Sequence, residues 1–261
     1  MHSDPAHGGG LYLQPVLYDV VNTPETAREV GALQRAARRF ARTSGPGSAW
    51  LEPACGTGRY LRVLAGRGRI VRGYDPLAEM LAYADRRLAT LGTKHRLAVN
   101  SFTDPLPRSI TPADVAFCPV NSVRHLTDDA AMLTHLAQIA RSLTPGGVYL
   151  VGIDLRDPGR VPDEDVWEAT RGSLSVQQII QYLPPTGRAR TERVIVELVV
   201  TRPRGVEHHS YAYDLRTYTE RQWRDLIGHS AFRRVATCDQ HGRPVEGTAR
   251  LPYQIEVLAP R

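Results

Sequence analysis

The chain has 261 residues, which is enough for one large domain that carries an insertion. Its net charge is +6, but the basic residues are scattered and no basic–aromatic stripe runs through them, so the composition gives no indication of a nucleic-acid partner. No apolar run approaches the length of a membrane helix, residues 1–10 lack a hydrophobic signal core, and the cysteines lack metal-ligand spacing. We therefore expect a reduced, cytoplasmic protein with a disordered start and no metal.

Strand-like apolar runs alternate with helical segments through the first 155 residues. Thr23-Pro24 predicts a helix start, because proline is favoured at the first helical position, and Ser44-Gly45-Pro46-Gly47 ends that helix. The pattern predicts strands at 49–53, 70–74, 95–100, 114–118 and 148–154, and helices at 24–42, 59–66, 76–91 and, capped by Thr127, 128–143. This alternation predicts an α/β fold with a doubly wound, mostly parallel sheet.

The pattern changes after residue 155. Runs at 165–172, 174–183, 189–201 and 206–217 are separated by turns rich in proline and glycine, which predicts an inserted antiparallel β lid. Thr219 and Gln222 form a capping-box pattern for a helix over 220–228, and runs at 232–238 and 253–258 predict a hairpin that brings the main sheet to seven strands. We therefore divide the chain into a flexible N-terminal segment and lid (1–22), an α/β core (23–155), the substrate-lid insertion (156–218) and a closing helix and hairpin (219–261).

Residues 50–59 carry the main chemical signal. They are typical of a buried strand ended by the acidic Glu52, a turn of small residues, and the first turn of a helix. Glycines let the backbone approach a ligand, and a helix N-terminus favours an anionic group. Asp75 ends the next apolar run, where a carboxylate accepts hydrogen bonds from a ribose diol. The segment predicts a nucleotide-cofactor site at the carboxyl ends of adjacent parallel strands.

Spacing separates the cofactor classes that use such a turn. A dinucleotide fingerprint needs a third glycine, and Leu61 or Arg59 stands at that position; a Walker-type phosphate loop is absent. The arrangement acid-x-small-x-Gly-x-Gly resembles motif I of the class I S-adenosylmethionine-dependent methyltransferases. The simpler alternative is an ordinary strand–turn–helix in which Asp75-Pro76 only starts a helix.

A narrower resemblance links the chain to small-molecule enzymes of the glycine and sugar-amine N-methyltransferase type. The insertion stands where these enzymes carry their substrate lid. Three short elements are also similar to theirs: Leu17-Tyr18-Asp19, Leu215-Arg216-Thr217-Tyr218-Thr219 and Ser230-Ala231-Phe232. Two departures are that Ser101 replaces an acid that meets the adenine in the family, and that Ala231 is not followed by the family's glycine.

The resemblance implies a cofactor, a product and a set of binding residues. The cofactor is S-adenosyl-L-methionine, the product is S-adenosyl-L-homocysteine, and the acceptor is a small molecule, with secondary metabolism as the setting. The implied cofactor-binding residues are Tyr18, Glu52, Ala54, Cys55, Gly56, Thr57, Gly58, Arg59, Asp75, Pro76, Met80, Ser101, Phe102, Pro119 and Asn121.

Candidate acceptor residues lie after the strand at 114–118 and in the insertion. His125 is the candidate general base, since an ordinary histidine pKa of about 6.5 suits proton transfer near neutrality; packing on the next helix is its structural alternative. The candidate substrate-binding residues are Trp167, Arg171, His209, Tyr211 and Tyr213. The last three share one face of a strand, which suits an acceptor pocket, a solvated sheet or a homodimer interface equally.

The leading hypothesis is an S-adenosylmethionine-dependent enzyme that moves a methyl group to an N or O nucleophile of a small molecule. Two alternatives stay open. One is a nucleic-acid or protein methyltransferase, which would show a basic acceptor face and strong salt dependence. The other is a methyltransferase-like protein that binds the cofactor without transferring its methyl group.

Overall fold

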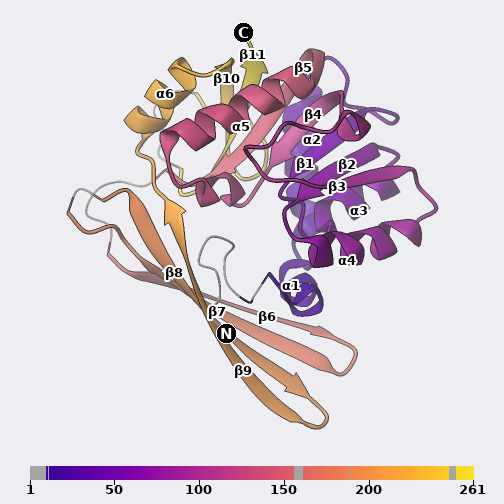
Figure 1. The fold of residues 1–261 in the computed structure, drawn as a ribbon, viewed down its shortest axis with the longest axis vertical. Coiled ribbons are helices and arrows are strands. Elements are labelled where there is room, and N and C mark those ends of the chain that lie inside the picture. The colour runs from indigo at the N-terminus through magenta and orange to yellow at the C-terminus, as the bar shows by residue number, and fades with distance from the viewer. Residues whose placement is uncertain (1–9, 11, 156–160, 188, 247–250) are drawn as a thin grey trace.

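The computed structural model describes residues 10, 12–155, 161–187, 189–246 and 251–261, so residues 1–9, for which disorder is expected, lie outside the described part. Its core is one seven-stranded sheet with the order β10-β11-β5-β4-β1-β2-β3, in which only β11 runs against its neighbours (Figure 1). The predicted doubly wound, mostly parallel sheet is confirmed. The strands are β1 (Ala49–Pro53), β2 (Ile70–Asp75), β3 (His95–Val99), β4 (Ala113–Cys118), β5 (Leu143–Ile153), β10 (Phe232–Cys238) and β11 (Gln254–Pro260).

Helices cover both faces of this sheet because successive strand residues point to opposite sides. Trp50 of β1 packs in a cluster with the helices of one face, and its neighbour Leu51 packs in the cluster of the other face. The first face carries α2 (Thr26–Phe40), α3 (Arg59–Gly66) and α4 (Ala78–Ala89); the second carries α5 (Asp129–Ser142) and α6 (Glu220–Gly228).

Local capping explains where two of these helices begin. The predicted capping box of α6 is present, because Thr219 Oγ1 accepts from the Gln222 amide at 3.2 Å and Gln222 Oε1 accepts from the Thr219 amide at 2.9 Å. At α5 the cap is Asp128 and not the expected Thr127, since Asp128 Oδ1 accepts from the Ala131 amide at 2.8 Å. No helix of the described ranges has the length and apolar character needed to cross a membrane.

The insertion forms a separate four-stranded antiparallel sheet, called the lid here, as predicted. Its strands pair in chain order: β6 (Asp163–Arg171), β7 (Leu174–Leu183), β8 (Thr191–Arg202) and β9 (Gly205–Arg216). The lid lies below the core in Figure 1, with one face turned toward α1.

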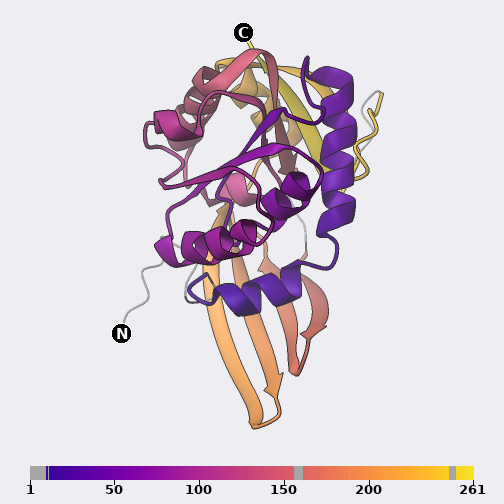
Figure 2. The same cartoon turned by 90° about the vertical axis from the view of Figure 1, so that its right-hand side faces the viewer.

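Helix α1 (Pro15–Asn22) lies between the lid and the core in both views (Figures 1 and 2). The sequence pattern gave no helix here. Leu17, Val20 and Val21 of α1 pack against the lid, in one apolar cluster with Val176 and Ile180 of β7 and with the apolar row of β8. An eight-residue helix is marginal alone, so the helix depends on this packing.

A buried ion pair joins the lid to the core. Arg124 lies in a single 3₁₀ turn, η4 (Ser122–His125), and it pairs with Glu192 of β8; both side chains are almost fully buried. Arg124 Nε also donates to the Arg216 carbonyl of β9 at 2.8 Å. The lid is therefore fixed against the segment that follows β4.

Candidate active site

The turn between β1 and α3 is held from the end of β2. Ala54, Gly56 and Gly58 have positive φ angles of 50°, 50° and 67°. The Gly56 amide donates to Asp75 Oδ2 at 2.8 Å, and the Leu77 amide donates to Asp75 Oδ1 at 3.0 Å. The Asp75 carboxylate therefore orients the glycine turn.

The turn also depends on a glycine that the sequence reasoning missed. A Cβ on Gly73 would lie 2.8 Å from both Cys55 Sγ and Leu61 Cδ1, so only glycine lets β2 run this close to the turn. A lone glycine inside a strand marks such a close approach, and that signal was available in the run at 70–74.

A cavity of about 520 Å³ opens at the carboxyl ends of β1 and β4, between the core, α1 and the lid. All three parts contribute to its wall. The core contributes Glu52, Ala54, Cys55, Arg59, Tyr60, Pro119, Val120, Asn121, Ser122 and His125; the N-terminal part contributes Tyr12, Tyr18, Val21, Asn22, Pro24, Glu25, Arg28 and Glu29; the lid contributes Trp167, Glu168, Gln178, Ile180, Tyr182, Tyr213 and Leu215.

Aromatic rings gather on one side of this cavity. The Tyr12 ring lies 5.7 Å from the Tyr18 ring, 6.0 Å from the Tyr213 ring and 5.8 Å from the His125 ring. The Tyr12 hydroxyl lies 3.3 Å from His125 Nε2. Burial, with a smaller contribution from the charge of Arg124, lowers the pKa of His125 to about 4, so the imidazole is neutral at physiological pH.

A strained turn forms another wall. Val120 and Asn121 follow β4 with φ angles of 53° and 63°, a region that costs a β-branched residue about 1–3 kcal/mol. Hydrogen bonds to distant segments hold the turn: the Val120 amide donates to the Tyr253 hydroxyl at 3.1 Å, the Asn121 amide to the Gly152 carbonyl at 3.0 Å, and the Asp154 amide to Asn121 Oδ1 at 2.8 Å.

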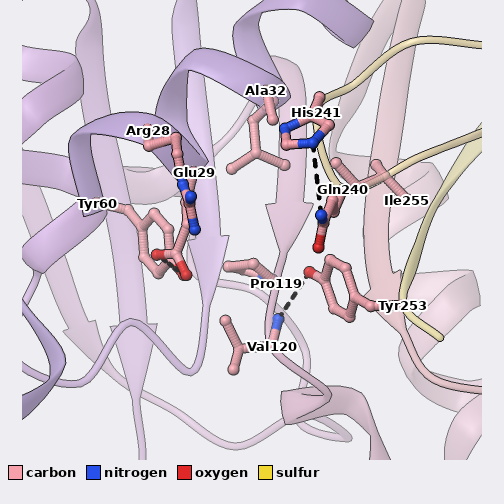
Figure 3. A pocket seen from close by; sticks show the side chains of 11 residues that line it. Arg28, Glu29, Ala32, Tyr60, Pro119, Val120, Gln240, His241, Tyr253 and Ile255 are labelled. Carbon is pink, nitrogen blue, oxygen red and sulfur yellow. Dashed lines mark hydrogen bonds between the residues drawn. The ribbon is translucent and has the colours of Figure 1, made fainter. Parts of the chain in front are cut away.

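A second cavity, of about 220 Å³, lies on the other side of the strained turn. Figure 3 shows Tyr60, Pro119 and Val120 facing Tyr253 across it, with the Tyr253 hydroxyl directed at the Val120 amide. Tyr60, Pro119 and Val120 line both cavities. Arg28 and Glu29 line both as well, so the two cavities share a wall built from α2, the start of α3 and the segment that follows β4.

Comparison with known proteins decides the family. A family model described as a methyltransferase domain matches residues 51–147. A curated relative from Streptomyces fradiae, named dTDP-3-amino-3,6-dideoxy-alpha-D-glucopyranose N,N-dimethyltransferase, is 30% identical over 215 residues, which cover 79% of this chain and 78% of the relative. The chain belongs to the class I S-adenosylmethionine-dependent methyltransferases of small molecules.

Solved structures show that the fold of this methyltransferase is shared. DesVI from Streptomyces venezuelae has a TM-score of 0.73 at 19% identity, with 94% of this chain and 96% of that chain covered. The sugar N-methyltransferase KedS8 from a Streptoalloteichus species has a TM-score of 0.70 at 20% identity, with 98% and 95% covered. Because the coverage is nearly complete, the lid and α1 belong to the common fold.

The cofactor of the methyltransferase is S-adenosylmethionine, and the cavity fits its methionine end. Glu52 is 3% exposed, and its Oε2 has no hydrogen-bond partner within the part of the chain that the structure describes. Burial raises the pKa of Glu52 well above its usual range, although the charge of Arg59 opposes this. A buried carboxylate oxygen without a partner fits the ammonium group of an amino acid, which would restore its charged form.

Other candidate cofactor residues divide between the cavity and its surroundings. Tyr18, Ala54, Cys55, Arg59, Pro119 and Asn121 line the cavity with Glu52. The Arg59 guanidinium is committed to α2, since it donates to Thr26 Oγ1 at 2.8 Å and to Glu29 Oε2 at 2.7 Å. Arg59 therefore supplies a fixed positive charge in the wall.

The remaining candidate cofactor residues lie outside the cavity lining. Met80 and Thr57 are buried, and Pro76 is exposed at the start of α4. The Phe102 ring meets the edge of the His135 ring at 4.8 Å, and the Ser101 amide donates to Asp104 Oδ2 at 3.3 Å. Gly56, Gly58 and Asp75 form the turn next to the cavity without lining it.

The lid candidates separate in the same way. Trp167 and Tyr213 line the cavity. Arg171 does not; its Nη2 lies 2.7 Å from Asp19 Oδ2 of α1. His209 and Tyr211 contact the N-terminal segment through Gln14 Nε2, which lies 3.5 Å from His209 Nδ1 and donates to the Tyr211 hydroxyl at 2.5 Å.

Several cavity residues were not among the sequence candidates. They include Tyr12, Tyr60, Gln178 and Tyr182. Tyr60 adjoins Arg59, a candidate that was named. The signal for Gln178 was a polar residue inside the apolar row of a strand. Nothing in the local sequence pointed to Tyr12, because its ring reaches the cavity only when α1 packs under the lid.

Proposed function

We propose that this methyltransferase methylates the amino group of an amino sugar carried on a nucleotide, in secondary metabolism. One observation carries the proposal: similarity to the Streptomyces fradiae relative spans 215 residues, whereas the methyltransferase-domain model covers only residues 51–147. The similarity therefore extends beyond the cofactor domain, into the parts that enclose the acceptor.

We assign the binding of the cofactor to the glycine turn and its neighbours. S-adenosylmethionine, when bound, supplies a methyl group on a positively charged sulfonium. Glu52 would hold the ammonium group, Asp75 the ribose hydroxyls, and the turn at Gly56 would let the backbone lie against the ligand. Tyr18 of α1 would cover this end of the cavity and exclude water.

The aromatic cluster suits an amine acceptor. Methylation converts a neutral amine into a cation, and the faces of Tyr12, Tyr18 and Tyr213 attract a positive charge. Hydrogen bonds from the amine N–H groups to tyrosine or imidazole acceptors would aim the nitrogen lone pair. Positioning of this kind accounts for most of what the protein must supply in an in-line displacement.

The lowered pKa of His125 changes its assigned role. A base with a pKa of about 4 is too weak to take a proton from an ammonium group. We therefore assign His125 to positioning the acceptor nitrogen through a hydrogen bond, in place of the general-base role predicted from the sequence.

The acceptor assignment is tested by direct turnover. We expect incubation of the protein with methyl-labelled S-adenosylmethionine and dTDP-3-amino-3,6-dideoxy-α-D-glucopyranose to give products carrying one and then two labelled methyl groups, read by mass spectrometry. The matched control is the same nucleotide sugar with a hydroxyl in place of the amine, which should stay unmethylated. Methylation of that control, or no product from the amine, would contradict the proposal.

His125→Asn should lower kcat by roughly fivefold, the effect of one lost hydrogen bond of about 1 kcal/mol, and not by the 10²–10⁴-fold typical of a removed general base. Since the pKa of His125 is lowered to about 4, the imidazole is already neutral above pH 5. The kcat–pH profiles of the variant and the wild type should therefore run parallel from pH 5 to 9. A wild-type limb near pH 6.5 that disappears in His125→Asn would restore the general-base role.

A further inference from the structure

One buried polar side chain in the lid, Gln178, has an amide oxygen without a hydrogen-bond partner among the described residues. Gln178 lies on β7 and is 4% exposed. The side chains two residues before and after it on the same face, Val176 and Ile180, are buried and apolar and pack in the cluster with α1. Because its neighbours on this face are apolar, an aliphatic residue would be expected at position 178.

The neighbouring strand β8 offers a comparison, because it carries a buried polar residue, Glu192, that does have a partner. Glu192 of β8 stands at the start of an apolar row, formed by Val194, Val196 and the alternate residues that follow. Its carboxylate pairs with Arg124 of the core. Glu192 thus has a partner that explains it, whereas the Gln178 amide oxygen, buried without one, costs stability.

The position of Gln178 indicates that its amide oxygen is available to a ligand. Gln178 lines the 520 Å³ cavity. Directly opposite it in the β6–β7 register stands Trp167, whose side chain lines the same cavity and is 44% exposed. An indole ring beside an amide suits a ligand with an apolar ring face and polar groups at its edge, because the aromatic surface gives contact area and the polar group fixes orientation.

We propose that Gln178 is a specificity-determining residue whose amide oxygen accepts a hydrogen bond from a hydroxyl or N–H group on the acceptor ring, while Trp167 packs on the face of that ring. The inference rests on the proposed function for the identity of the acceptor. It is independent of the cofactor, since Gln178 comes from the lid and the cofactor residues come from the core and α1.

The test replaces the amide by a side chain of similar length that cannot accept this bond. Gln178→Met should raise the Tm of the free protein by about 2–4 °C, because an unpartnered buried polar group is removed. The same variant should lower kcat/KM for dTDP-3-amino-3,6-dideoxy-α-D-glucopyranose by roughly 10- to 100-fold, since the acceptor group is left without its partner. The dissociation constant of S-adenosylmethionine, measured by calorimetry, should stay within about twofold, the limit we set for no effect, since no bond to Gln178 is assigned to the cofactor.

Gln177→Met is the matched control, with the same chemical change one residue away on the opposite face of β7. It should leave both the Tm and the acceptor kcat/KM near the wild-type values. A lower Tm for Gln178→Met would show that Gln178 is structural, and an unchanged acceptor kcat/KM would show that it does not bind the acceptor. A wild-type protein that leaves the nucleotide sugar unmethylated would count against the proposed function alone, and the Tm comparison would still decide whether Gln178 stabilises the fold.

Discussion

Gly58→Val is expected to destabilise the folded protein by about 3 kcal/mol or more, whereas Gly56→Ala is expected to weaken cofactor binding in a protein that stays folded. Gly58 has a φ of 67°, and its Cβ would lie 3.1 Å from the Ala84 Cβ of α4. A valine there combines left-handed strain with overpacking between α3 and α4. In the sequence, Gly58 is only one of the cofactor-binding residues that the resemblance implies.

Gly56 provides the contrast within the same turn. A Cβ there would have only Tyr18 Cε1 nearby, at 4.0 Å, so it would stand on the side of the turn that faces α1. Gly56→Ala should cost about 1–2 kcal/mol of stability from its φ of 50° and weaken S-adenosylmethionine binding by tenfold or more.

Urea unfolding and calorimetry on both variants give the two quantities. The assignment of separate roles to the two glycines fails if Gly58→Val unfolds like the wild type. It fails equally if Gly56→Ala binds the cofactor with wild-type affinity.

Asp19→Ala is expected to have the second large effect, because Asp19 joins three parts of the molecule. Its carboxylate is fully buried and lies 2.9 Å from Arg62 Nη2 of α3 and 2.7 Å from Arg171 Nη2 of the lid, and it accepts from the Tyr83 hydroxyl of α4 at 2.9 Å. Burial alone would raise the pKa of Asp19, but the arginines and the tyrosine hydroxyl hold it below its usual value.

Removing this carboxylate leaves Arg62, whose side chain is only 12% exposed, without that partner. Breaking a buried pair in this way costs about 3–5 kcal/mol. The loss should release α1 from the core and the lid together, and with it Tyr18, so the affinity for S-adenosylmethionine should fall as well. Urea unfolding and calorimetry report the two effects.

Asp214→Ala is the matched control for Asp19→Ala. Asp214 pairs with Arg193 at 3.0 Å, but both side chains are about half exposed, and exposed pairs contribute only about 0–1 kcal/mol. The two variants remove the same group from a lid ion pair and differ in burial. Equal losses of stability from the two variants would contradict the claim that the buried Asp19 carboxylate holds α1, the core and the lid together.

The sequence by itself determined the parts of this methyltransferase that depend on neighbouring residues. Alternation of apolar runs and helical segments predicted the parallel sheet, and the change of period after residue 155 predicted the lid. Glu52, the glycine turn and Asp75 could be recognised because their chemistry lies within two adjacent strand–turn units. Thr219 and Gln222 predicted a capping box that the structure contains, since both partners lie within one helical turn.

Only the tertiary structure decided which side chains meet across long stretches of chain. The sequence makes Arg171 a candidate for substrate binding, but packing brings it to Asp19, and a Cβ on Gly58 would point at α4. The pKa of His125 is lowered mainly by burial and further by the charge of Arg124, and no local pattern reveals that burial. Likewise, Gln178 becomes a candidate for acceptor binding only because it lines a cavity between the lid, α1 and the core. Burial and charge at a site are sums over residues distant in sequence, and the fold alone brings those residues together.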